Sequence, residues 1–421
     1  MKKKLTLSTT LTLIVLTAAL AVSVTMMLAM RYFNRQVQWV SQRKAMYTYI
    51  DDVDQAIREQ YATLNEETLR QSVLAGFVEG TGDPYAAYYT PQGYVNEQQR
   101  LSGYATNVGV SVCNDADGNV VVYAVAADSA AAKAGVQKGD IVKQINSTDI
   151  AGKKYGEIQL MIDSGEKVLI SVQRGDSTVA FELSPYRYVV RSVQGSVINS
   201  VGYIKISAFY ENTPSQFAET IAAIKQEGIT GLVLDFRNNR GGLRSSMQEM
   251  VSQLMPLGVY GNATDKKGNV TALSSSVNEQ LGLATVALVN GNTAGEAEFI
   301  VGAMQESSLA TVVGVTTAGK AKYQDYIKVD MDNSAIKLTT GEYTLLKGGS
   351  YEGKGIVPSK LVMLTAEQQA IFPLLTSETD PQLKAALEQL GTSDSNALNN
   401  TTTTTLAPQS TTAASTTTTK K

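Results

Sequence analysis

Histidine is absent from the 421 residues of this sequence, and cysteine occurs once, as Cys113. The absence of histidine excludes Ser-His-Asp and Cys-His catalytic centres within this sequence, and also metal sites built on imidazole. A catalytic base would therefore have to be lysine, aspartate or glutamate. A single cysteine excludes an internal disulfide and a cysteine-cluster zinc site. We expect Cys113 to be a small core residue, with a reactive thiol as the alternative.

Neither sign of charge dominates, because 36 lysines and arginines stand against 39 aspartates and glutamates. The formal net charge of −3 gives no argument for nucleic-acid binding. We expect no metal site and no cofactor.

One long apolar run stands near the start of the sequence. Residues 5–30 carry no charge, follow three lysines and precede Arg31. About 20 apolar residues suffice to span a bilayer as a helix. A signal peptide cleaved near Ala19-Leu20-Ala21 is the alternative, but cleavage there would leave an apolar stub over 22–30. The sequence therefore predicts a membrane anchor over residues 1–34, a single-pass cell-membrane protein, and an extracytoplasmic location for the bulk of the chain.

The other end of the sequence is rich in serine, asparagine and threonine from residue 391 onward. Such a tract cannot bury enough apolar surface to offset the entropy of ordering it. Residues 391–421 are expected to be a disordered tail.

The region after the apolar run shows helical spacing. Val53, Ile57 and Tyr61 fall on one face of a helix, and the segment Gly82-Asp83-Pro84 interrupts the pattern. Residues 35–100 are predicted to form an N-terminal helical region.

Short β-branched stretches follow, at 108–112, 120–124 and 168–173. Between them lie a short helix ended by Gly135 and a second helix at 154–162. Residues 101–185, with their Ala134-Gly135-Val136 and Gly139-Asp140-Ile141 segments, resemble a PDZ domain. PDZ domains capture C-terminal carboxylates on a loop of backbone N–H groups and add the peptide to a sheet as a strand. By resemblance, the peptide-binding loop consists of Ser102, Gly103, Tyr104, Ala105, Thr106, Asn107, Val108 and Gly109.

Residues 186–390 alternate between strand and helix patterns. Buried strands are predicted at 201–206, 231–236, 285–289 and 311–314, with helices at 214–227, 245–254 and 295–305. This alternation favours an α/β core with a mixed sheet.

Several blocks of this core, in order along the chain, are similar to those of the carboxy-terminal processing peptidases, also called tail-specific proteases. The blocks are residues 202–209, 234–243, 353–358 and 380–383, preceded by Gly82-Asp83-Pro84-Tyr85. The resemblance covers roughly residues 40–390, with the PDZ domain inserted as in the family. It implies a multidomain α/β (α+β) protein with a mixed-sheet, ClpP/crotonase-like protease core.

That family is known for a Ser-Lys dyad, and the resemblance places glycine where its nucleophilic serine belongs. The family's [ST]-Ala-Ser-Ala-Ser-Glu motif aligns with Thr293-Ala294-Gly295-Glu296-Ala297-Glu298. The resemblance implies that Lys320 holds the position of the general base and Gln324 that of the residue orienting it. It also maps the oxyanion-hole backbone N–H groups to Gly241 and Glu296.

Gly295 has no side chain and cannot form an acyl-enzyme, and loss of such a nucleophile costs on the order of 10⁶ in turnover. Glu296 replaces a small residue, and we expect its carboxylate to pair with Lys320 and favour the charged lysine. Arg240 is expected to crowd the donor at Gly241. Thr293 is two residues from the proper place for a substitute nucleophile.

Three functions remain open from the sequence. The first is a catalytically inactive, membrane-anchored homologue that binds protein C-termini through its PDZ domain, alone, as a homo-oligomer or paired with an active sister protease. The second is an active tail-specific serine endopeptidase with an unrecognised nucleophile. The third is an extracytoplasmic structural adaptor that binds no peptide.

Overall fold

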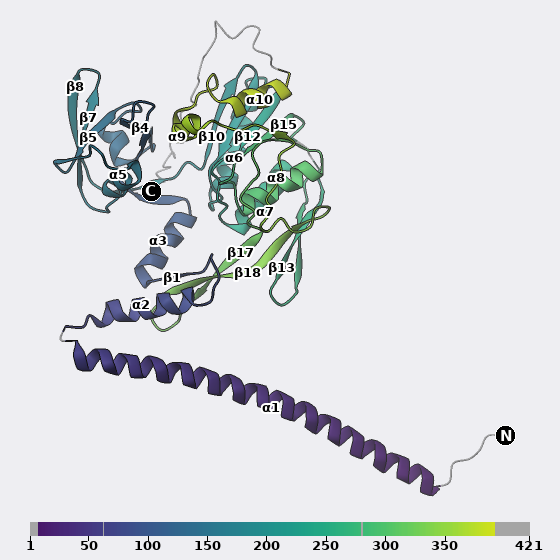
Figure 1. The fold of residues 1–421 in the computed structure, drawn as a ribbon. Coiled ribbons are helices and arrows are strands. Elements are labelled where there is room, and N and C mark those ends of the chain that lie inside the picture. Colours follow the sequence, from purple (N-terminus) through teal and green to yellow (C-terminus); the bar gives the residue numbers. More distant parts are fainter. Residues whose placement is uncertain (1–6, 62, 279–280, 392–421) are drawn as a thin grey trace, which may run out of the picture. The chain divides into compact units, whose positions relative to one another are not determined.

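The computed structural model describes residues 7–61, 63–278 and 281–391. The chain divides into two compact units, Met1–Leu74 and Ala75–Lys421 (Figure 1). The tail expected over 391–421 lies outside the described residues, apart from residue 391.

The first unit is dominated by one long helix, α1 (Leu7–Gln60). Its segment Leu13–Asn34 has a mean hydropathy of 2.4 and none of it is buried, so it is long and apolar enough to cross a membrane. At the other end of α1, Arg58 pairs with Asp54 and with Glu66, at the start of α2 (Glu66–Glu79). These pairs are exposed and contribute little to stability.

The second unit begins with elements that the helical pattern did not fully predict. Helix α3 (Pro91–Leu101) starts at the N-cap Thr90, whose hydroxyl accepts a hydrogen bond from the backbone N–H of Gly93. Strand β1 (Ala87–Tyr89) precedes it and pairs with β18 (Ala335–Leu345). The region predicted to be helical thus also contains the short strand β1, which is stabilised by a strand almost 250 residues later in the chain.

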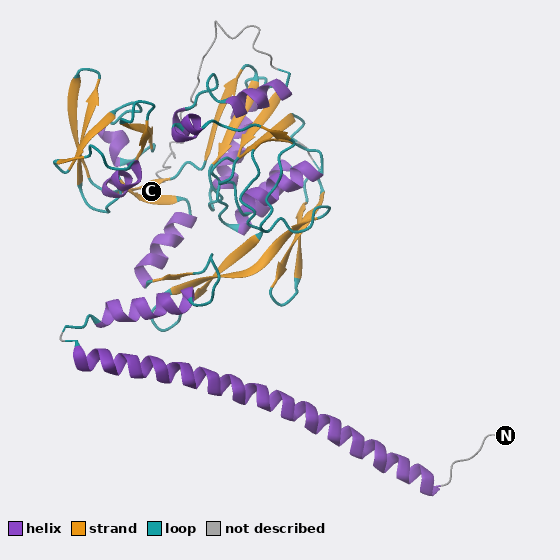
Figure 2. Ribbon diagram, in the orientation of Figure 1, coloured by secondary structure: helices purple, strands orange, loops and turns teal. Residues whose placement is uncertain are grey.

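A six-stranded antiparallel sheet and two helices form the PDZ-like part (Figure 2). Its elements are β3 (Val110–Asn114), β4 (Val120–Val125), α4 (Ala130–Ala134), β5 (Ile141–Ile145), β6 (Thr148–Asp149), α5 (Tyr155–Ile162), β7 (Val168–Arg174) and β8 (Ser177–Leu183).

Local signals in the sequence explain the short helix α4. Ser129 caps its start by accepting from the N–H of Ala132, and Gly135 ends it in the left-handed conformation. Cys113 is buried in β3, and burial raises the pKa of its thiol, as expected for a core residue.

The core of the second unit is a six-stranded sheet in the order β10-β11-β12-β15-β16-β19, in which all neighbours are parallel except β10 and β11. Its strands are β10 (Val193–Ile198), β11 (Val201–Ile206), β12 (Gly231–Asp235), β15 (Ala284–Val289), β16 (Thr311–Gly314) and β19 (Lys360–Leu361). The associated helices are α6 (Thr213–Lys225), α7 (Arg244–Leu254), α8 (Glu296–Glu306) and α10 (Pro381–Gln389), and α9 (Ala366–Ala370) and the 3₁₀ turn η1 (Phe372–Leu374) lead to α10.

Helices cover both faces of this sheet. Leu232 and Leu234 of β12 belong to the cluster that includes α6, α7 and α8, whereas Val233 belongs to the cluster that includes α10. Successive side chains of a strand point to opposite faces. A continuous apolar strand such as β12 is therefore what a sheet buried on both faces requires.

A second sheet was not predicted from the sequence. It has the order β1-β18-β13-β14, with β17 also pairing with β18. The further strands are β13 (Gly258–Asp265), β14 (Val270–Ser275) and β17 (Lys322–Lys328). This sheet matters for the site, because β17 begins two residues after Lys320.

Candidate active-site region

Gly295 lies in the turn between β15 and α8, at the carboxyl edge of the parallel strands. It is the N-cap of α8, with φ 64° and ψ −124°, a backbone conformation that side-chain-bearing residues rarely adopt. The start of a helix favours negative charge. The turn is a strand-to-helix corner whose backbone glycine adopts readily, and position 295 itself carries no hydroxyl.

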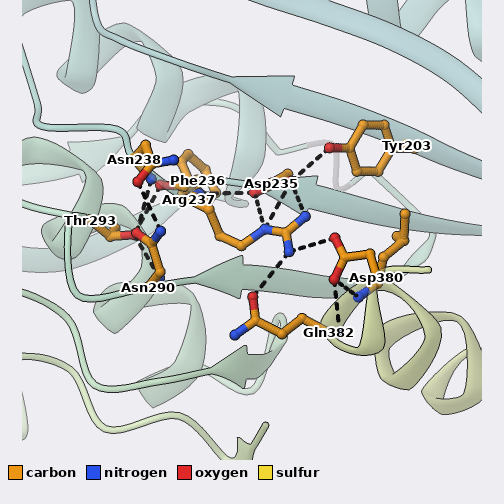
Figure 3. Close-up of polar contacts among 10 residues, drawn as sticks. Tyr203, Asp235, Phe236, Arg237, Asn238, Asn290, Thr293, Asp380 and Gln382 are labelled. Atoms are coloured by element: carbon orange, nitrogen blue, oxygen red, sulfur yellow. Dashed lines mark hydrogen bonds and ion pairs between the residues drawn. The ribbon is translucent and has the colours of Figure 1, made fainter. Parts of the chain in front are cut away.

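Side-chain amides tie this turn to the loop after β12 (Figure 3). Asn238 Oδ1 accepts hydrogen bonds from the Nδ2 atoms of Asn290 and Asn292, and the Asn238 N–H donates to Asn290 Oδ1. Thr293 is fully buried, and its hydroxyl donates to the carbonyl of Phe236. Thr293 is thus a structural residue of the turn, which argues against its use as a nucleophile.

A buried ionic cluster fixes the end of β12 just before this loop (Figure 3). The Arg237 guanidinium is 3% exposed and pairs with Asp235 and Asp380, both at 2.7 Å. Burial opposes ionisation of Asp235, but the attraction of Arg237 and its hydrogen bonds hold the pKa of that carboxyl below its ordinary value. Tyr203 also donates to Asp235, at 2.6 Å, and Gln382 accepts from Arg237. The cluster joins β11, β12 and the start of α10.

The loop that contains Gly241 lies against Gly295, as the family resemblance implied. A Cβ atom built on Gly295 would lie 3.8 Å from the Cα of Gly241 and 3.7 Å from the carbonyl oxygen of Arg240. The Gly241 N–H, however, donates to Asn239 Oδ1 at 2.9 Å. In this conformation it is already engaged by the protein.

The Glu296 carboxylate sits beside the same loop. Its Oε2 accepts from the N–H of Gly242 at 3.0 Å, and its Oε1 accepts from the Tyr343 hydroxyl at 2.9 Å. Oε2 lies 2.2 Å from where a Cβ on Gly241 would stand. Burial, followed by the charge of Glu296, raises the pKa of Tyr343 well above its ordinary value, so this hydroxyl remains a donor. The Glu296 carboxylate thus lies against Gly241, whose N–H group the resemblance assigns to the oxyanion hole.

Glu298 is a second buried carboxylate and connects the two halves of the candidate dyad. Its Oε2 accepts from the backbone N–H groups of Gly295, at 3.0 Å, and Lys320, at 2.8 Å. Its Oε1 accepts from the Gly319 N–H and from the Thr317 hydroxyl. One fully buried side chain therefore holds positions 295 and 320 close together.

The expected ion pair between Glu296 and Lys320 is absent from the described residues. The Lys320 ammonium instead lies over the Tyr85 ring, 4.7 Å from its centroid. Arg240 is exposed. The crowding of Gly241 by its side chain stays a prediction.

Gln324 lies on β17 and donates to the Thr339 hydroxyl and to the Lys322 carbonyl. Thr339 in turn donates from its N–H and its hydroxyl to Asp83. Gln324 is thus joined to the Gly82-Asp83-Pro84 turn, while no hydrogen bond between Gln324 and Lys320 occurs in the described part of the chain.

The expected peptide-binding segment, residues 102–109, is not an open loop. Tyr104–Asn107 form β2, which pairs antiparallel with β9 (Tyr186–Val189). Asn107 Oδ1 accepts from the N–H of Gly109, and a Cβ on Gly109 would lie 2.2 Å from that of Ser129. Local sequence does not predict the pairing of β2 with β9. Because of this pairing, only residues 108 and 109 of the expected loop connect β2 to β3 without belonging to a strand.

The comparisons with known proteins agree with this architecture. Residues 200–362 match the model of peptidase family S41, and residues 121–174 match that of the PDZ domain. The chain thus contains a region that matches the S41 peptidases and a region that matches PDZ domains, and it is similar to the carboxy-terminal processing peptidases.

Two relatives show the extent of the similarity. The carboxy-terminal processing protease CtpA of Bacillus subtilis (strain 168) is 26% identical over 313 residues, which cover 72% of this chain and 66% of that relative. The carboxyl-terminal-processing protease of Synechocystis sp. is 26% identical over 372 residues, covering 85% and 82%. A solved structure, the putative S41 protease from Bacteroides fragilis NCTC 9343, has 17% identity and a TM-score of 0.54 over 68% of this chain and 83% of that one, which supports the fold.

Three contributors to the site were not predicted from the sequence. They are the Glu298 carboxylate, which accepts from the backbone at positions 295 and 320, the Tyr343 hydroxyl, which donates to Glu296, and the hydrogen-bonded side-chain amides of Asn238 and Asn290. Glu298 stands at the third position of α8, where an acidic side chain commonly reaches back to the N-cap, so the capping pattern could have indicated it. Tyr343 has no local signal, because it comes from the second sheet.

Proposed function

We propose that this protein is a membrane-anchored, extracytoplasmic homologue of the carboxy-terminal processing peptidases that binds protein C-termini through its PDZ domain and does not cleave them. The observation that carries the proposal is the pair of neighbours Gly295 and Glu296. The first lacks the attacking hydroxyl, and the second places a carboxylate against Gly241 and Gly242.

Acyl transfer needs both of the features that this pair removes. A nucleophile must attack the peptide carbonyl, and N–H donors must stabilise the oxyanion that forms. A carboxylate beside those donors would repel the oxyanion, and the Glu296 carboxylate lies against Gly241, whose N–H already donates to Asn239. Peptide binding to the PDZ domain requires neither feature, so it can persist without catalysis.

One experiment tests both halves of the proposal. The full chain in detergent is incubated with unstructured peptides that end in a free apolar residue or in the corresponding amide. We expect weak binding of the free-acid peptide, several-fold weaker binding of the amide, and no cleavage product by mass spectrometry.

Either half can fail separately. Cleavage that is abolished by Lys320→Ala would establish an active peptidase with another nucleophile. The absence of binding to either peptide would favour an adaptor that does not use its PDZ domain for peptides.

A further inference from the structure

Strand β3 is at the edge of the PDZ sheet. In the order β3-β4-β5-β7-β8 of the described strands, β4 is its one neighbour, and the helix α5 packs against it. A peptide that joins a PDZ sheet adds as a strand to such an edge, through main-chain hydrogen bonds. The outer edge of β3, beside α5, is therefore the place that the peptide would need.

The side chain of Gln159, on α5, already makes hydrogen bonds with this edge. The Val112 N–H donates to Gln159 Oε1 at 3.0 Å, and Gln159 Nε2 donates to the Val110 carbonyl at 2.9 Å. The carbonyl of one residue and the N–H of the residue two positions later point to the same side of a strand. One amide group therefore provides the acceptor and the donor that an added backbone would provide.

Asp163 holds the amide in this orientation. Gln159 Nε2 donates to Asp163 Oδ2 at 2.8 Å, one helical turn further along. The three hydrogen bonds together use both N–H groups of the amide and its oxygen. Rotation of the amide by 180° would place its NH₂ group against the Val112 N–H, so this arrangement alone satisfies all of the partners.

We propose that the Gln159 side chain occupies the peptide-binding edge of β3 in the free protein. A C-terminal peptide must displace this side chain before the peptide can pair with β3. The inference rests on the proposed function, that is, on peptide binding by the PDZ domain. It adds that Gln159 satisfies the hydrogen-bonding groups of this edge in the free protein and thereby sets the affinity of the PDZ domain for peptides. Peptides that form main-chain hydrogen bonds with β3 over several residues would displace the Gln159 amide and bind. Peptides that pair with β3 over a shorter stretch would not displace it.

The test measures peptide affinity of the full chain in detergent, by fluorescence anisotropy of a labelled decapeptide with a free apolar C-terminal residue. Gln159→Ala removes the amide, and Gln159→Glu keeps its size but cannot donate to the Val110 carbonyl and is repelled by Asp163. We expect both variants to bind about five-fold or more tightly than the wild type, given the usual net contribution of two hydrogen bonds. Glu157→Ala, an exposed change on the same helix, is the matched control and should bind like the wild type.

Each outcome separates the inference from the proposed function. Equal or weaker binding by Gln159→Ala, in a wild type that does bind, would overturn this role of Gln159 and leave the proposed function intact. No binding by any variant, with thermal unfolding unchanged, would overturn both. Tighter binding that is insensitive to amidation of the peptide would support this role of Gln159 and reject carboxylate capture.

Discussion

At the scale of single residues, position 295 could hold a serine. A Cβ atom there would make ordinary contacts, at 3.7 and 3.8 Å, with Arg240 and Gly241. The positive φ of 64° would cost a serine about 1–3 kcal/mol, which a well-packed turn can sustain. A serine hydroxyl could therefore be restored at position 295 without a steric clash of its Cβ atom, and the neighbouring Glu296 carboxylate is a second, separate obstacle to catalysis.

We expect that Gly295→Ser alone leaves peptide hydrolysis near background. Glu296 would still keep its carboxylate beside Gly241, an assigned oxyanion-hole donor. Adding Glu296→Ala removes this carboxylate and should raise the rate by about 10²-fold, an effect of the size of one oxyanion-hole donor. The measurement is single-turnover cleavage of an unstructured peptide by the single and double variants.

Two further variants act as controls for this rescue. Gly295→Ser with Glu296→Gln removes the charge but keeps the shape, so an intermediate rate is expected. Lys320→Ala in the double variant should abolish the gained activity. Efficient cleavage by Gly295→Ser alone would show that Glu296 moves aside and that only the nucleophile was lost. Arg240→Gly added to the double variant tests the predicted crowding of Gly241, and an unchanged rate would reject that crowding.

At the scale of elements, Asp83 connects the turn after α2 to β18. Its carboxylate accepts from the N–H and hydroxyl of Thr339 and from the N–H of Tyr85. Burial opposes ionisation, but these backbone hydrogen bonds outweigh it and hold the pKa of Asp83 below its ordinary value of 3.8. A depressed folded-state pKa means that the ionised group stabilises the fold above about pH 3.8, and that this contribution is lost as the pH falls through the folded-state pKa.

Asp83→Asn should therefore destabilise the second unit in a pH-dependent way. At pH 7 we expect a loss of about 1 kcal/mol in the free energy of unfolding, from weakened hydrogen bonds to a charged acceptor. As the pH falls below 3.8, the difference between the wild type and the variant should narrow. Urea unfolding at pH 7 and pH 3 measures this, with the exposed change Glu79→Gln as control. A gap that stays constant between pH 7 and pH 3 would contradict the role of the ionised carboxylate.

The core sheet was predictable from the sequence because its signals are local. β11 was predicted at 201–206 and has these bounds, and β12 and β15 differ by one residue from expectation. Continuous apolar runs between helices leave few alternatives to a buried parallel strand. Gly295 was expected at the start of a helix and is the N-cap of α8.

The second sheet and the side-chain partners were not predictable in the same way. Most of β18 is half-buried, so its polar and apolar residues show no clear alternation, and its partners β1 and β13 come from distant parts of the chain. The direction of the Glu296 side chain depends on Tyr343, which lies on β18. An ion pair between Glu296 and Lys320 was therefore a reasonable expectation from charge, but the tertiary structure directs the Glu296 carboxylate to Tyr343 and Gly242 instead.

At the scale of the whole molecule, the N-terminal helix bears on where the protein acts. The segment Leu13–Asn34 has 22 residues, about 33 Å of helix, which matches the roughly 30 Å hydrocarbon core of a bilayer. α1 runs without interruption across the possible cleavage site at 19–21 and on to Gln60. The exposed apolar side chains along this helix fit a segment that lipid surrounds, as in a membrane anchor or a signal sequence.

We expect the mature protein to keep this segment and to stay in the membrane fraction after alkaline extraction. Its intact mass should include residues 1–34, and a variant lacking them should be recovered in the soluble fraction. Ala19→Leu combined with Ala21→Leu, which would block a signal peptidase, should leave the size of the protein unchanged. A mature N-terminus at Val22, together with release from the membrane, would instead establish a secreted protein. In that case the PDZ domain would meet protein C-termini away from the membrane surface.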